Sequence, residues 1–84
     1  MNERYKEPRL NSSVLIVTIS GTLEKQKVIT KDDTGFTIHS SGVDIKYQYS
    51  DYCFTWFSTM DEVKAKYKVF KENNKIYIQE KRYF

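Results

Sequence analysis

The sequence predicts an α+β fold that is mostly antiparallel: a β meander or a small, partly open barrel of five to six strands, with one short helix near residues 59–67. Apolar and polar side chains alternate with a period of two in residues 43–50, as they do in a strand with one buried face. The Asn73-Asn74 pair tolerates the positive φ that a two-residue hairpin turn requires. A threonine and a glutamate with the spacing of a capping box stand at the start of the expected helix.

The N-terminal region divides into an arm and the first strand. Residues 1–11 carry charges with no period, which predicts a flexible arm ahead of a single small β-rich domain in residues 12–84. The domain opens with an apolar, β-branched run from Ser13 to Ser20 that ends at Gly21. Such a run is typical of a strand covered on both faces, so we expect it at the centre of the sheet.

Further strands follow in hairpin succession. Residues 27–31 have the composition of a short strand, residues 32–35 that of a turn, and residues 36–40 that of the returning strand. After another turn, the alternating segment 43–50 places its apolar side chains on one face. Residues 52–57 are apolar enough either to continue that strand after a bend or to form a buried connection, and the pattern leaves both open.

The helix that begins after Thr59 is compatible with two lengths. Apolar residues at helical spacing extend to Phe70, whereas the tyrosine, valine and phenylalanine at the end of this segment prefer strands. We expect the short helix, because a strand from Tyr67 then pairs with residues 75–81 across the asparagine turn.

Composition indicates one small domain. A chain of 84 residues buries roughly 60–65 % of its unfolded surface, and thirteen aromatic residues supply large side chains for the core. Cys53 is the single cysteine, which excludes an internal disulfide and a multi-cysteine metal site and fits a reducing compartment. The isolated glycines offer no phosphate-binding loop, so we expect no metal and no other cofactor.

Charge and hydropathy set expectations for location and partners. The longest apolar run, residues 14–17, is too short to span a bilayer, and the charged first ten residues do not resemble a targeting segment, so we expect a cytoplasmic protein without membrane contact. A net charge of +3 allows an acidic partner, but eleven of the fourteen cations are Lys rather than the Arg typical of base-specific recognition. The length and the Lys, Asn, Ile and Tyr content are also associated with small accessory proteins of mobile elements.

Three features suggest catalytic chemistry, and each has a simpler interpretation. Asp33-Thr34-Gly35 is the tripeptide of aspartic proteases, but a lysine and an aspartate precede it and a bulky Phe36 follows, which fits a turn. His39 is the sole histidine, and we expect it to be solvated on a strand. Cys53 lies in an apolar run, where a thiol packs as a small hydrophobe. We therefore predict that the protein is not an enzyme.

Lysines interleaved with tyrosines in the last quarter of the chain suggest a partner, although lysines also serve simply to protect edge strands. Our first hypothesis is a non-enzymatic protein–protein interaction module, an adaptor or inhibitor of a larger protein. The alternative is weak, sequence-independent nucleic-acid binding by a Lys and aromatic face of the C-terminal hairpin. An edge strand also offers a route to a homodimer. The candidate interaction surface comprises Trp56, Lys64, Lys66, Lys68, Tyr77, Lys81, Arg82 and Tyr83.

Overall fold

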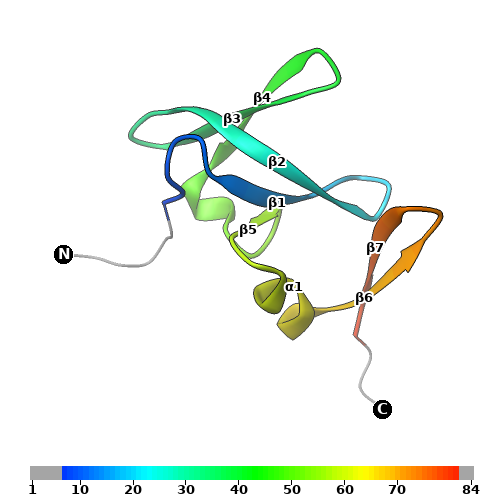
Figure 1. The fold of residues 1–84 in the computed structure, drawn as a ribbon. Helices are drawn as coiled ribbons and strands as arrows, with labels where there is room; N and C mark the ends of the chain where they lie inside the picture. The colour runs from blue at the N-terminus through cyan, green and yellow to red at the C-terminus, as the bar shows by residue number, and fades with distance from the viewer. Residues whose placement is uncertain (1–6, 82–84) are drawn as a thin grey trace.

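The computed structural model describes residues 7–81 (Figure 1). In these residues seven strands and an α-helix form one α+β domain. The elements are β1 (Ser13–Val17), β2 (Thr22–Lys31), β3 (Gly35–Ser40), β4 (Val43–Gln48), the 3₁₀ turn η1 (Tyr49–Asp51), β5 (Trp56–Phe57), α1 (Met60–Lys66), β6 (Tyr67–Glu72) and β7 (Lys75–Glu80).

Five strands form a curled half-barrel in the order β4-β3-β2-β1-β5, and every neighbouring pair is antiparallel. The β6–β7 hairpin joins this sheet through β7, which pairs with the start of β2 at Thr22 and Leu23. In Figure 1 the hairpin stands to one side of the half-barrel, separate from the β3–β4 hairpin. The predicted antiparallel, partly open architecture is confirmed, with more strands than the five to six expected.

β1 is covered on both faces, as predicted. Val14 and Ile16 belong to a buried cluster that we name the barrel cluster, which is completed by Val28, Phe36, Ile38, Tyr49 and Trp56. Leu15 and Val17 pack against a second group, the hairpin cluster, built on buried Leu23, Phe57 and Val63. The strand ends at Val17 rather than Ser20, because residues 18–21 turn back toward β2 and leave Ile19 fully exposed.

β2 is longer than the predicted strand of residues 27–31, and it serves both clusters. Leu23 is buried in the hairpin cluster and Val28 in the barrel cluster, so two residues of opposite parity are both internal. The register with β3 shifts between Val28 and Thr30, which marks a bulge. The two clusters lie on opposite faces of β1 and β2, so regular alternation from Leu23 to Val28 gives one residue to each cluster, and the bulge bends the strand only beyond Val28.

The segment between β4 and α1 contains a tight turn and a very short strand. The alternation of residues 43–50 ends early, because η1 begins at Tyr49 and buries that ring. Residues 52–57 do not continue β4; they turn and form β5, which pairs with β1 through Leu15 and Phe57. Trp56 in β5 is fully buried and meets the edge of Phe36, with ring centroids 4.9 Å apart.

The end of the chain matches the short-helix prediction. Thr59 and Glu62 form a reciprocal capping box at the start of α1, as their spacing predicted. The helix stops at Lys66 and the chain extends at once into β6, so the longer helix to Phe70 is excluded. Asn73 and Asn74 have φ of 51° and 66°, the left-handed conformation expected for this hairpin turn.

The part of the predicted arm that is described, residues 7–11, lies against β2. The amide of Asn11 donates to the carbonyl of Val28 at 2.8 Å, and Lys31 Nζ lies 3.0 Å from the Glu7 carboxylate. Residues 1–6 of the predicted arm fall outside the described residues. Among the helices in residues 7–81, none has the length and apolarity needed to cross a bilayer.

Candidate interaction surface

The pairing register sorts the side chains of the C-terminal hairpin onto two faces. Directly opposed residues of an antiparallel pair point to the same side of the hairpin. The side whose residues pack on the hairpin cluster is the inward face, and the other side is the outward face. The inward face includes Tyr67, Val69, Ile76 and Ile78, which pack half-buried against the hairpin cluster. The outward face, which we name the hairpin face, comprises Lys68, Phe70, Glu72, Lys75, Tyr77 and Gln79.

Two aromatic rings occupy the centre of the hairpin face. Phe70 and Tyr77 are cross-strand partners, and their rings stack with centroids 5.6 Å apart and an interplanar angle of 16°. Phe70 remains 42 % exposed even though it stacks on its neighbour. The flanking rows each contain one exposed lysine, Lys68 on β6 and Lys75 on β7. The hairpin face therefore carries a stacked ring pair, with Phe70 exposed and Tyr77 half-buried, between Lys68 at one end and the Glu72–Lys75 pair at the other.

Charge is divided unequally along the chain. Residues 64–81 contain six lysines and two glutamates, whereas residues 7–63 contain eight acidic and five basic residues. The hairpin and the end of α1 are thus cationic beside a mildly anionic half-barrel. A separation of this kind steers an anionic partner toward the hairpin more strongly than the overall charge of +3 indicates.

The other predicted lysines lie beside the hairpin rather than on its face. Lys66, at the end of α1, donates to the carbonyl of Cys53 at 2.5 Å, and its Nζ lies 4.4 Å from the centre of the exposed Phe54 ring. Lys81 donates to the carbonyl of Ala65 at 3.5 Å. Lys64 is exposed in the last turn of α1. The structure therefore engages Lys66 and Lys81 in local contacts.

Two corrections to the predicted surface concern aromatic residues. Trp56 was expected as a surface anchor, but it is fully buried and its Nε1 donates to the carbonyl of Gln48 at 3.0 Å, so it is a core residue. Phe70 and Phe54, which the sequence analysis does not select, are exposed rings instead, and Phe70 lies on the hairpin face. Pairing outward from the asparagine turn would have placed Phe70 opposite Tyr77. Arg82 and Tyr83 lie outside the described residues.

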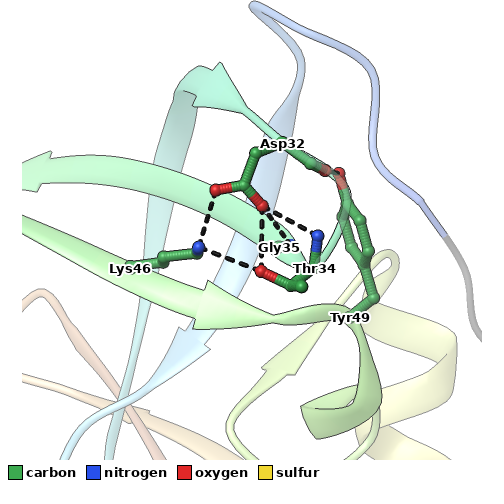
Figure 2. A network of polar contacts seen from close by, with 5 residues as sticks. All are labelled: Asp32, Thr34, Gly35, Lys46 and Tyr49. Atoms are coloured by element: carbon green, nitrogen blue, oxygen red, sulfur yellow. Dashed lines mark hydrogen bonds and ion pairs between the residues drawn. The ribbon is translucent and has the colours of Figure 1, made fainter.

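The turn that contains Asp33-Thr34-Gly35 is organised by the preceding residue, Asp32 (Figure 2). Asp32 Oδ1 accepts hydrogen bonds from the Thr34 amide at 2.8 Å, the Thr34 hydroxyl at 3.0 Å and the Gly35 amide at 3.0 Å, and Lys46 Nζ lies 2.6 Å from Oδ2. Lys46, followed by these donors, holds the pKa of Asp32 far below its ordinary value. The bonds from Thr34 and Gly35 close the turn and Lys46 joins it to β4, so the predicted turn interpretation is confirmed.

His39 and Cys53 are not joined to a reactive cluster in the described residues. His39 Nδ1 lies 2.8 Å from the carboxylate of Asp44, and both side chains are exposed on the outer face of β3 and β4. Cys53 is half-buried and packs against the hairpin cluster, with φ of 70°. No group of three or more His, Cys, Asp or Glu within residues 7–81 has the proximity needed to hold a metal ion.

A groove also runs between the half-barrel and the start of α1. Its volume is about 360 Å³, and its lining is mainly apolar, with Leu15, Leu23, Met60 and Ile76.

Comparison of the chain with protein-family models, with curated proteins and with solved structures found no match.

Proposed function

We propose that this protein is a non-enzymatic protein-binding module, an adaptor or inhibitor, that docks on its partner with the hairpin face. The observation that carries the proposal is the exposed Phe70 ring, stacked on half-buried Tyr77 between Lys68 and Lys75. Aromatic anchors surrounded by charged residues are the composition of binding hot spots in protein interfaces. The lysines indicate a partner surface that combines an apolar recess with nearby carboxylates.

The hairpin face is supported from behind. Its inward side packs on the hairpin cluster, and Ile76 and Tyr77 pair with β2, which belongs to the half-barrel. The rings are also held by each other, so few rotamers are lost when a partner binds. A surface that is already ordered avoids part of the entropic cost of association.

Site-specific photo-crosslinking tests this proposal. A benzoyl-phenylalanine at position 70 is expected to crosslink a defined partner in cells, whereas the same probe at the exposed Asp33, in the β2–β3 turn, is not. The crosslink to this partner should disappear when Lys68→Glu and Lys75→Glu are added, because the new carboxylates repel an acidic surface. No specific crosslink at position 70, or an equal one at position 33, would contradict the proposal.

Single-stranded nucleic acid is the second candidate, favoured by the same ring pair. Bases stack on exposed aromatic rings while lysines contact phosphates, and such binding is insensitive to sequence. Fluorescence anisotropy with an oligothymidine at low salt is expected to detect weak binding. The Lys68→Gln/Lys75→Gln variant should weaken it and reduce the salt slope by roughly 0.7 per lysine.

The matched control for this candidate is Lys25→Gln/Lys27→Gln, which removes two exposed lysines from β2 and leaves the hairpin face intact. If both double variants bind equally, the interaction reflects net charge alone. If oligothymidine is not bound at low salt while position 70 crosslinks a protein, the nucleic-acid candidate is rejected and the first proposal stands.

A further inference from the structure

β4 is an open edge of the half-barrel. Among the described strands it pairs with β3 alone, in an unbroken register of six residue pairs, so one row of its backbone donors and acceptors has no strand partner. It contains neither proline nor a bulge, two of the features that protect edge strands, and its single lysine, Lys46, is paired with Asp32 at 2.6 Å. Val43 is 57 % and Ile45 38 % exposed, although both are apolar. This strand therefore offers both hydrogen bonds and apolar side chains to a partner strand.

We propose that the partner is a second copy of this chain, with the two β4 strands paired antiparallel about a two-fold axis at Ile45. The sequence Val43-Asp44-Ile45-Lys46-Tyr47 is self-complementary in this arrangement. Ile45 faces Ile45 of the second copy, Val43 faces Tyr47, and Asp44 faces Lys46. Because a two-fold axis repeats each contact, two apolar pairs and two opposite-charge pairs flank the central one.

The charges select this register over its neighbours. A two-fold axis perpendicular to the sheet must pass through a residue position, since opposed side chains have to point to the same face. With the axis at Asp44, that carboxylate would oppose its own copy, and with the axis at Lys46, two ammonium groups would be opposed. Like charges directly opposite one another destabilise strand pairing. The axis at Ile45 avoids both.

The apolar side of β4 is already held in place for pairing. Tyr47 and Ile45 are the cross-strand partners of Phe36 and Ile38 of the barrel cluster, and Val43, two residues before Ile45, points to the same face. Tyr47 stacks on Phe36 with centroids 5.9 Å apart, and together with Ile45 it lines a groove of about 220 Å³ toward the β1–β2 turn. The second copy would cover Val43 and Ile45 and continue this apolar strip.

The polar side carries alternating charges up to the open edge. His39 on β3 lies 2.8 Å from Asp44, and Lys46 lies 2.6 Å from Asp32. In the proposed dimer Asp44 stands between His39 and Lys46 of the second copy, and Lys46 stands between Asp32 and Asp44 of the second copy. Lys46 thus has a carboxylate on both sides, and Asp44 lies between the imidazole of His39 and the ammonium group of the second copy's Lys46. The hairpin face lies on other strands, so this inference is independent of the proposed function.

Sedimentation velocity of the full chain across a concentration series tests the proposal, and a reversible dimer is expected. In Asp44→Lys the new lysine of each copy faces Lys46 of the other, which creates two like-charge pairs. This variant should weaken association roughly ten- to thirtyfold. Asp44→Lys/Lys46→Asp restores opposite charges across the axis and should recover most of the affinity. Glu72→Lys makes the same charge change at the tip of the other hairpin and should leave the dimer unchanged. Thermal melts confirm that each variant is folded.

The register is tested by disulfide trapping in a Cys53→Ser background. Ile45→Cys is expected to form an intermolecular disulfide under mild oxidation, because this position faces its own copy. Val43→Cys should not, since its neighbour across the axis is Tyr47. A chain that stays monomeric at millimolar concentration, a dimer insensitive to Asp44→Lys, or preferential trapping at position 43 would each overturn the proposal.

Discussion

The hydroxyl of Tyr52 donates a hydrogen bond to Glu62, the same glutamate that closes the capping box of α1. Glu62 Oε1 also accepts from the amides of Ser58 at 2.9 Å and Thr59 at 3.2 Å. Burial and this bond to a carboxylate together raise the pKa of Tyr52 far above its ordinary value. One glutamate therefore joins the segment after η1 to the first turn of the helix.

Removing this bond should destabilise the fold without unfolding it. Tyr52→Phe deletes the hydroxyl while keeping the ring that packs on Trp56, so we expect a loss of about 1–2 kcal/mol in the free energy of unfolding by urea. Tyr77→Phe is the control, because the described residues provide no hydrogen-bond partner for its hydroxyl. An equal effect of the two substitutions would show that the bond to Glu62 contributes nothing.

Glycine is required at position 35 by close packing. A Cβ there would lie 2.1 Å from the carbonyl oxygen of Tyr47, which is backbone and cannot move aside locally. Gly35→Ala is expected to cost about 3 kcal/mol or more, measured by chemical denaturation. At Gly42 an added Cβ would have no atom within 4 Å, but the residue has a positive φ of 80°, which an alanine disfavours. Gly42→Ala is therefore expected to lower the free energy of unfolding by about 1–2 kcal/mol. A smaller loss at position 35 than at 42 would be inconsistent with this contact.

The bonds to Asp32 predict a pH-dependent stability. Because its pKa is lower in the folded state than in the unfolded chain, the unfolded chain binds the proton first as the pH falls. The stabilisation is complete above the ordinary pKa of about 3.9 and decreases below it. Asp32→Asn should therefore lower the Tm at neutral pH, and the difference from wild type should shrink in strongly acidic solution. A difference that is constant with pH would exclude the carboxylate as its cause.

The asparagine turn should respond to the backbone freedom of its residues. Asn74 has a φ of 66°, so Asn74→Gly is expected to preserve or slightly increase the stability of the β6–β7 hairpin. Asn74→Val should lower it by roughly 1–2 kcal/mol, because a β-branched side chain disfavours positive φ. Amide hydrogen exchange of the hairpin is the appropriate measurement. Equal exchange in both variants would mean that the turn does not limit hairpin opening.

The sequence predicted elements whose signals are local. Thr59 and Glu62 are three residues apart, and Asn73-Asn74 is a contiguous pair, so both the helix start and the last hairpin could be identified from neighbouring residues. The sequence predicts a shorter β2 because residues 24–27 are all polar, and because Leu23 and Val28 lie on opposite faces, so that neither face shows an apolar alternation. The second cluster, which buries Leu23, is a tertiary feature.

The candidate surface was only partly predictable. Tyr77, Lys68 and their hairpin could be derived from alternation, and both residues are found on the hairpin face. Trp56 was misplaced because burial of a single aromatic residue depends on which strand covers it, and β5 is only two residues long. Ile19 was likewise placed in a strand, since an apolar run alone does not show where the chain reverses.

The pairing of β1 with β5 has a consequence for how the protein is made. Leu15 meets Phe57 across half the length of the chain, and the hairpin cluster also requires Val63. During synthesis the first strands emerge from the ribosome long before these residues, so the nascent chain holds β1 with one flank uncovered. Closing contacts this distant in sequence slows folding, and the native core cannot form until Phe57 and Val63 have left the ribosome.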